Sequence, residues 1–512
     1  LLDCGRRDDR LRALMRARRS LRALLVLAVG CTSETAGSPQ TTPADDLVEV
    51  GAEPTDTPGL EDVPAVDQNT PDVSTEDASA PGDVQTPDDL ASGVDVTAPP
   101  TFCEALGLEA RAFDGGAGGT HRHELAADFT VPQVVGADFH LQEQWTGCET
   151  YVFIPDIIPV DELNNASVWT TDLSGLISKS PKNVHYFFVS RQGEEAADAM
   201  TGQMQGAVQT ALAALSTEEA THWRAHLHVV KGSGPKLGGW IPDVLAGIGQ
   251  IGFAIDRSQT LRGIGSLADV SKFSQKLQNE NKWPWSANIA YAAHDARHFN
   301  AEAVREAAVA AAGPATVVAL WKGEVLEQFA EMDVELPEDV ATADTLEIEI
   351  EMRCPNPNAP EAGNCGAWDY LAYLFVDDPA DPAQRIQIAR FITSYHRETH
   401  WILDVSPMLA FIQASGKRHF RWEYAPEWNK QPTATYLSLR FSNRGKGMRP
   451  YLAKPLWTGG GLGTGYDAAH EDLSVGIPEG AKRTELYAVI TGHGAETSQC
   501  AEFCDHQHEI TV

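Results

Sequence analysis

The chain has 512 residues, enough for three or four domains of about 100–200 residues each. Its 43% hydrophobic and 22% charged residues can form cores, which excludes a wholly disordered chain. The 72 acidic against 39 basic side chains give a formal net charge of -33. An acidic surface repels phosphates, so we expect no nucleic-acid partner.

The N-terminal segment has the features of a bacterial export signal. Four arginines between positions 16 and 22 precede an apolar run at 23–29, which is too short to cross a bilayer. Gly30-Cys31 follows and resembles a lipobox, whose cysteine would be lipidated and begin the mature protein. An ordinary secretory signal cut nearby is the alternative. We therefore expect upstream residues and a signal in 1–31, and a cell-envelope protein that contacts a membrane only through its N-terminal lipid.

Residues 32–100 form a predicted linker. The stretch 31–100 holds 16 acidic residues and 10 of the 30 prolines, with no Lys, Arg, Phe, Trp or Tyr. Such a composition cannot bury enough apolar surface to offset the entropy of ordering, so we expect a disordered, extended spacer.

Six cysteines remain when Cys4 and Cys31 are set aside. An even number in an exported protein is typical of disulfides. Because they are close in the sequence, we expect Cys354 to pair with Cys365 and Cys500 with Cys504. By elimination, Cys103 then pairs with Cys148. Zinc is the alternative for four of them, but the expected CxxC and His spacing is missing.

The region 101–313 has the pattern of an α/β domain. Strand-like runs at 128–132, 151–155, 184–190, 226–231 and 251–257 are separated by helical stretches at 195–216, 216–227 and 301–312. This alternation predicts βαβ units and a largely parallel sheet.

The order of these runs resembles the redoxin branch of the thioredoxin-like fold. The family's redox CxxC would follow the strand at 151–155, where residues 155–164 contain no cysteine. We therefore expect a redox-inactive thioredoxin-like module. His121-x-His123 and His226-x-His228 have the spacing of metal ligands, but we interpret both pairs as structural.

From Trp321 onward the sequence is typical of antiparallel β-structure. Short runs at 329–337, 345–354, 371–376, 385–395, 434–442 and 486–492 alternate apolar and polar residues. Period-2 alternation with turn residues between runs predicts sandwiches or jelly rolls.

Three motifs in this region resemble the peptide-N-glycosidase F family. They are EMRCPNPNAPEAGNCGAWDY, RFITSY and CAEFC, in that order. The resemblance covers about 320–512 and implies two antiparallel jelly rolls, the first at 314–445 and the second beginning at 446–512. It also implies an amidase acting on N-linked glycoproteins or glycopeptides, with an active site in the cleft between the rolls and no cofactor or metal.

The same resemblance implies the catalytic residues. Asp369 matches the principal aspartate and Glu502 the glutamate between the last two cysteines. The third acid is Glu427, which precedes Trp428, or Glu423. Hydrolysis of a substituted amide requires one carboxylate to activate water and one acid to protonate the leaving nitrogen, and crowded carboxyls can keep one of them protonated.

Aromatic side chains near these acids are candidate sugar platforms. We assign substrate binding to Trp368, Tyr370, Trp428 and His493. Two of these positions depart from the family, which commonly has Arg where Tyr370 stands and Trp where His493 stands. The missing initial Met and an ending inside an apparent strand also predict that the sequence is a fragment of a longer protein.

Two alternative functions remain open. A non-catalytic glycan- or glycopeptide-binding lipoprotein would account for the lost Arg and Trp. Copper monooxygenases share the paired-roll architecture, and His506-x-His508 is a copper-like pair. A second copper site would have to come from His396, His400 and His419, which are not adjacent to one another.

Overall fold

The computed structural model describes residues 26–30, 100–156, 168–170, 172–269, 286–457, 465–491 and 510. The chain divides into two compact units, Leu1–Ser33 with Thr101–Val512 and Glu34–Pro100. Nearly all of the predicted linker lies outside the described residues. The predicted domain boundaries stay predictions.

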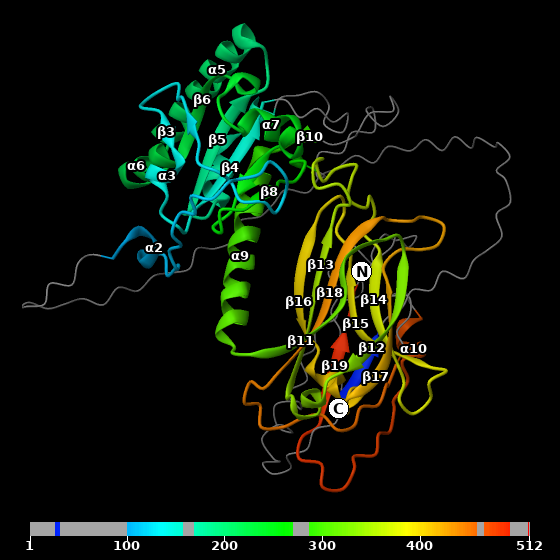
Figure 1. Ribbon diagram of the computed structural model, residues 1–512. Helices are drawn as coiled ribbons and strands as arrows, with labels where there is room; N and C mark the ends of the chain where they lie inside the picture. The colour runs from blue at the N-terminus through cyan, green and yellow to red at the C-terminus, as the bar shows by residue number, and fades with distance from the viewer. Residues whose placement is uncertain are drawn as a thin grey trace, which may run out of the picture. The chain divides into compact units, whose positions relative to one another are not determined.

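The α/β region is built on a five-stranded sheet (Figure 1). Its strand order is β6-β5-β4-β7-β8. The strands are β4 (Thr150–Pro155), β5 (Val184–Ser190), β6 (Leu227–Ser233), β7 (Phe253–Ile255) and β8 (Leu261–Gly263). β4, β5 and β6 are parallel, whereas β7 and β8 form an antiparallel hairpin beside β4.

The sheet is therefore mixed, and the prediction of a largely parallel sheet was right for only three strands. The direction of β8 follows from the tight turn after β7. Asp256 accepts hydrogen bonds from the backbone N–H groups of Ser258 and Thr260, at 2.8 and 3.1 Å. Gln259 takes a positive φ of 58° there. This side-chain-capped turn reverses the chain without a crossover helix.

Both faces of this sheet are covered, because every residue of β4 and β5 is buried. One core includes Val152 and Tyr186 and packs against α4 (Leu173–Lys179), α5 (Glu194–Ala213), α6 (Thr217–His226) and α9 (Ala292–Ala311). The other core includes Phe153 and Phe187 and packs against α7 (Ile241–Ala246) and the segment before β4.

Two predicted elements differ from the structure. The run at 128–132 forms only the short strand β2 (Thr130–Val131), which pairs with β3 (Phe139–His140) outside the main sheet. Helix α9 begins at Ala292, before the predicted start at 301, because an apolar face of Ala293, Ala296 and Phe299 packs into the core.

The remaining elements of the region are short. They are α2 (Phe102–Ala105), α3 (Leu141–Gln144), β9 (Ala268–Asp269), β10 (Ser286–Ala287) and the 3-10 helices η1 (Val168–Thr170), η2 (Gly234–Lys236), η3 (Ile248–Gln250) and η5 (Ile289–Tyr291).

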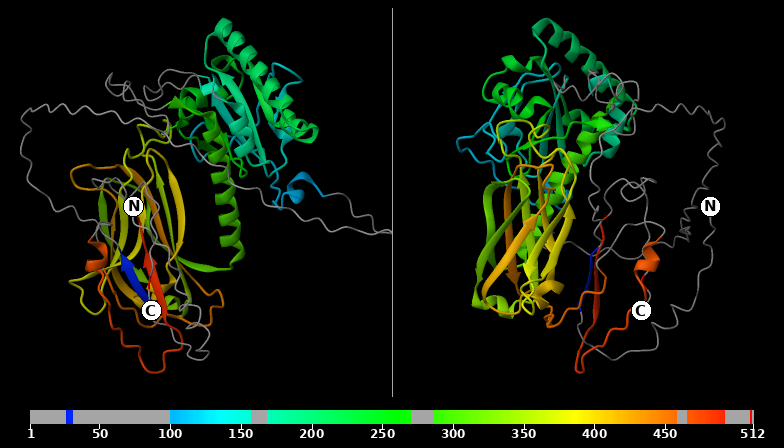
Figure 2. Two further views of the ribbon diagram at one scale, coloured as in Figure 1. Left: turned by 180° about the vertical axis from the view of Figure 1, so that it is seen from behind. Right: turned by 90° about the vertical axis from the view of Figure 1, so that its right-hand side faces the viewer.

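Two four-stranded antiparallel sheets follow and form a β-sandwich (Figure 2). Their orders are β11-β18-β13-β16 and β12-β17-β14-β15. The strands are β11 (Ala315–Leu326), β12 (Phe329–Leu336), β13 (Thr345–Arg353), β14 (Leu371–Asp377), β15 (Arg385–Ile392), β16 (Thr399–Asp404), β17 (Gly416–Glu423) and β18 (Thr433–Ser442). This distribution of strands over two sheets is the connectivity of a jelly roll.

Alternation along the strands places the sandwich core. In β14, Ala372, Leu374 and Val376 are buried, and the residues between them are partly exposed. The buried positions of both sheets meet in one apolar cluster. Because side chains alternate between the two faces of a strand, this pattern produces a sheet covered on one side.

The region after β18 contains fewer described elements. They are α10 (Tyr466–Ala469) and β19 (Glu485–Val489), which pairs in parallel with β1 (Val26–Gly30). Within the sandwich, two 3-10 helices, η6 (Glu338–Thr342) and η7 (Ser406–Ala410), follow β12 and β16. Of the predicted second roll, the structure describes residues 446–457, 465–491 and 510, which do not form a second roll by themselves. Among the described helices, none is both long and apolar enough for a bilayer.

Two of the three expected disulfides lie in described segments and are present. Cys103–Cys148 joins α2 to the residues before β4, and Cys354–Cys365 closes a loop between β13 and β14. Cys500 and Cys504 lie outside the described residues.

Candidate functional site

Asp369 lies at the end of the β13–β14 loop, directly before β14. The Cys354–Cys365 disulfide closes the first part of this loop. The neighbouring backbone is tied to the end of β15, because Tyr370 N–H donates to Thr393 Oγ1 and Thr393 N–H donates to the Tyr370 carbonyl, each at 2.8 Å. The loop therefore holds Asp369 at one rim of the sandwich.

Three predicted sugar-binding aromatic residues lie next to Asp369 in the chain or contact its neighbour Tyr370. Trp368 is 53% exposed, and Trp428, in the β17–β18 turn, is 79% exposed. The Tyr370 ring lies edge-on to Trp428 with ring centroids 6.1 Å apart, and its hydroxyl accepts a hydrogen bond from Asn429 Nδ2 at 2.7 Å. The structure thus brings Trp428 next to the residue that follows Asp369.

The two candidates for the third acid differ in their surroundings. Glu423 ends β17, and its carboxylate pairs with the Arg421 guanidinium at 3.0 Å. Glu427 is exposed in the β17–β18 turn, beside Trp428. Glu427 thus neighbours the two turn residues that contact Tyr370, whereas Glu423 is partly neutralised on its own strand.

Glu502 and His493 lie outside the described residues. Their roles, and the pairing of Glu502 with Asp369, stay predictions.

Beside the Asp369 loop, the β15–β16 loop holds a group of buried ion pairs. Glu398 accepts from Arg122 at 3.0 Å and pairs with His123 at 2.7 Å. Burial opposes its charge, but the His123 hydrogen bond and the Arg122 charge outweigh that effect and lower the pKa of Glu398 to about 2. Arg397 binds the carboxylates of Asp295 at 2.9 Å and Glu361 at 2.6 Å.

Four of these charged side chains, Asp295, Glu361, Arg397 and Glu398, line a cavity of about 530 Å³. Its walls include Tyr395, His396 and Arg397 from the β15–β16 loop, and Asp295 and His298 from α9. This cavity could not be predicted from the sequence, because α9 and the β15–β16 loop, which both contribute to its walls, lie about 100 residues apart.

The histidines weighed for a second copper site are not brought together in the described structure. His400 pairs with Glu349 at 3.1 Å on one sheet, and His419 pairs with Asp333 at 2.9 Å on the other. His396 lies in the β15–β16 loop, and His506 and His508 lie outside the described residues.

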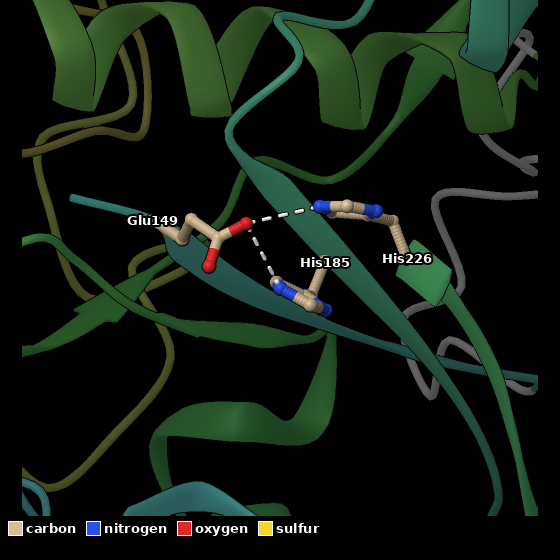
Figure 3. A group of neighbouring side chains, drawn as sticks. All are labelled: Glu149, His185 and His226. Atoms are coloured by element: carbon tan, nitrogen blue, oxygen red, sulfur yellow. Dashed lines mark hydrogen bonds and ion pairs between the residues drawn. The ribbon is translucent and has the colours of Figure 1, made fainter. Parts of the chain in front are cut away.

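A second polar group lies inside the α/β region (Figure 3). Glu149 Oε1 is 3.1 Å from His185 Nε2 and 2.9 Å from His226 Nε2, and all three side chains are buried. Their ligand atoms are close enough to hold a metal ion. The spacing of His226-x-His228 is evident in the sequence. Nothing in the sequence indicates that His226 lies beside Glu149 and His185, which stand at the starts of neighbouring strands.

The comparisons with known proteins concern the C-terminal part of the chain. Residues 463–512 match the family model described as "Peptide-N-glycosidase F, C terminal". This region therefore resembles peptide-N-glycosidase F. No curated protein matches the chain.

Solved structures of peptide-N-glycosidase F also match, at low overall similarity. Recombinant peptide-N-glycanase F is 18% identical with a TM-score of 0.21, and the enzyme from Flavobacterium meningosepticum, described as a glycosylasparaginase, is 19% identical with the same score. Each match covers 26% of this chain and 44% of the other. PNGF-II is 12% identical with a TM-score of 0.20, covering 26% and 35%. The chain thus spans less than half the length of these relatives.

Proposed function

We propose that the chain is an amidase of the peptide-N-glycosidase F type. Its substrate is an N-linked glycoprotein or glycopeptide, and it hydrolyses the amide bond between N-acetylglucosamine and the Asn side chain. The observation that carries this proposal is the family match over residues 463–512, which contains Glu502. The motif around Asp369, far outside that match, supports it independently.

The reaction requires two carboxyl groups with different tasks. Water adds to the side-chain carbonyl carbon while one carboxylate removes its proton. The C–N bond then breaks as an acid protonates the departing nitrogen, leaving aspartate and a glycosylamine. Asp369 is our candidate for the group that activates water, with Glu502 and Glu427 as the other acids.

The surroundings of Asp369 support a carbohydrate site. Trp368 and Trp428 are exposed, and the apolar faces of such rings suit the apolar faces of sugar rings. The disulfide and the Thr393 hydrogen bonds hold this rim in place. A preorganised site of this kind positions substrate with little entropic cost.

The direct test is incubation of the chain with an N-glycosylated peptide, followed by mass spectrometry. We expect Asn-to-Asp conversion with the wild type and its loss in Asp369→Asn. Asp381→Asn is the matched control, because Asp381 is an exposed turn carboxylate between β14 and β15. Equal conversion by both variants would contradict the proposed role of Asp369.

A glycan-binding protein is the second candidate function. The observation that favours it is Tyr370, which stands where the family commonly has a cation. Binding of the glycopeptide to the folded chain without any conversion, weakened by Trp428→Ala, would support the binder and contradict the amidase.

We also propose that the protein is exported and lipid-anchored through Cys31. The basic and apolar segments before Gly30-Cys31 support this location. Metabolic labelling with a fatty acid tests it: we expect label in the wild type and none in Cys31→Ala. Label in both would contradict the anchor.

A further inference from the structure

The buried group of Glu149, His185 and His226 is assembled by the starts of three neighbouring parallel strands. Glu149 precedes β4, His185 is the second residue of β5, and His226 precedes β6. These side chains are only 2%, 6% and 8% exposed. Buried polar groups need partners, so the hydrogen bonds of each imidazole decide what this group can bind.

The tautomer of His226 is set by a backbone carbonyl. Its Nδ1 lies 2.7 Å from the His222 carbonyl oxygen, which can only accept, so Nδ1 carries the proton. In the neutral ring, Nε2 then presents a lone pair toward Glu149 Oε1 at 2.9 Å. With the ring neutral, two acceptors face each other at this contact, and either a proton or a metal cation between them removes the repulsion.

A chain of hydrogen bonds sets the tautomer of His185 in the same way. Gln133 Nε2 donates to the Ala137 carbonyl at 2.7 Å, which turns Gln133 Oε1 toward His228. His228 Nδ1–H donates to that oxygen at 2.9 Å, so His228 Nε2 accepts from His185 Nδ1–H, also at 2.9 Å. His185 Nε2 is left with a lone pair that lies 3.1 Å from Glu149 Oε1, and no donor among the described residues reaches this buried atom.

We propose that Glu149, His185 and His226 bind a divalent transition-metal ion, with Zn²⁺ the best fit. Zn²⁺ takes imidazole nitrogen and carboxylate oxygen at about 2.0–2.2 Å, and bond angles of roughly 90–110° place two ligand atoms about 2.9–3.4 Å apart. The contacts of 3.1 and 2.9 Å at Glu149 Oε1 agree with this spacing. A metal cation bound by Glu149 Oε1, His185 Nε2 and His226 Nε2 removes the repulsion between the lone pairs of these three atoms.

The outer contacts match those of metal-binding histidines. Such histidines donate their second ring N–H to a carbonyl or another acceptor, which fixes the ring. His226 uses the His222 carbonyl, and His185 uses His228. The second oxygen of Glu149 accepts from Thr146 Oγ1 at 2.7 Å, leaving Oε1 for the metal.

The position favours a structural metal over a catalytic one. The group lies at the N-terminal ends of the parallel strands, whereas ligands in α/β sheets bind outside the carboxyl ends. The Phe102 ring lies 6.0 Å from that of His226, and Cys103–Cys148 ties Phe102's helix beside Glu149. The metal would join the starts of β4, β5 and β6 to the end of α6, whose last residue is His226.

The test uses the full chain, stripped with a chelator and titrated with ZnCl₂ and CoCl₂. We expect one metal ion per chain, visible d–d bands for Co²⁺, and a rise in the unfolding midpoint on adding Zn²⁺. Glu149→Gln keeps the shape of the side chain but loses its charge. Losing an outer partner, a group that hydrogen-bonds a metal ligand, typically weakens metal binding by roughly 10–100-fold. Losing the ligand Glu149 itself should weaken Zn²⁺ binding by more than that. Gln133→Leu removes the acceptor that orients His228, the outer partner of His185, and should weaken binding by no more than that range. His140→Ala, which deletes a nearby imidazole outside the group, should bind as the wild type does.

Circular dichroism of each stripped variant separates binding from folding. A folded wild type that binds neither Zn²⁺ nor Co²⁺ would overturn the proposal. A Glu149→Gln chain that is folded and binds with unchanged affinity would also overturn it. Should Glu149→Gln not fold, His226→Asn takes its place with the same criterion.

Discussion

Asp369 is the side chain on which the proposed hydrolysis depends most. Replacing it with Asn keeps its size and removes the negative charge that would activate water. We expect Asp369→Asn to lower kcat by about 10²–10⁴-fold, the usual contribution of a positioned base, with little change in KM. Initial rates on a fluorescent glycopeptide measure this. A KM effect without a kcat effect would instead assign Asp369 to binding.

The exposed aromatic residues should act on binding alone. Trp428 is 79% exposed, so its truncation costs the fold little. Stacking on a ring contributes about 0.5–1.5 kcal/mol, or roughly 2- to 12-fold in affinity. We therefore expect Trp428→Ala to raise KM by several-fold and leave the unfolding midpoint unchanged. An unaltered KM would exclude Trp428 from the sugar site.

At the scale of elements, Glu398 ties the β15–β16 loop to His123 and Arg122. Its pKa is about 2 in the folded state, against an ordinary 4.5. A lowered carboxylate pKa stabilises the fold above the unfolded-state value, and this contribution is lost as the pH falls from about 4.5 toward 2. At neutral pH it amounts to about 3 kcal/mol.

Glu398→Gln tests this linkage in urea titrations between pH 7 and 3. We expect the variant to be less stable than the wild type at pH 7, with the difference shrinking below pH 4.5. A difference independent of pH would show that the Glu398 charge does not act as described.

The elements also show what sequence patterns can and cannot reveal. Alternation predicted β12, β13, β14 and β18, because a sandwich strand has one buried face. It missed β16, which is partly buried at most positions and therefore lacks a clear period. The β7–β8 hairpin was missed because its turn depends on the Asp256 side chain and a positive φ at Gln259.

At the scale of the whole described unit, Arg397 joins the α/β region to the sandwich. Its partners Asp295, on α9, and Glu361, in the β13–β14 loop, are each 6% exposed. Removing the guanidinium leaves two buried carboxylates without their cation, which costs about 3 kcal/mol or more. We expect Arg397→Met to lower the unfolding midpoint in calorimetry.

Arg385→Met is the matched control for that change. The Arg385 pair with Glu331 is exposed on the sandwich surface, and exposed pairs contribute little. An equal effect of both variants would contradict the importance of the buried position.

Only those parts of the candidate sites that are formed by residues close together in the sequence could be predicted. The Cys354–Cys365 loop is local, so sequence alone predicted its disulfide. The role of the neighbouring Trp368-Asp369-Tyr370 motif stays a prediction. The group of Glu149, His185 and His226 depends on the register of three strands, which composition and spacing do not specify.

The most direct measurement for the proposed amidase is the hydrolysis of a glycopeptide in H₂¹⁸O, read by tandem mass spectrometry. If water attacks the Asn side-chain carbonyl, the former glycosylation site becomes aspartate carrying one ¹⁸O, and the intact glycan leaves as the amine. A peptide that keeps its Asn with a residual N-acetylglucosamine, or an unlabelled and uncleaved peptide, would contradict the account.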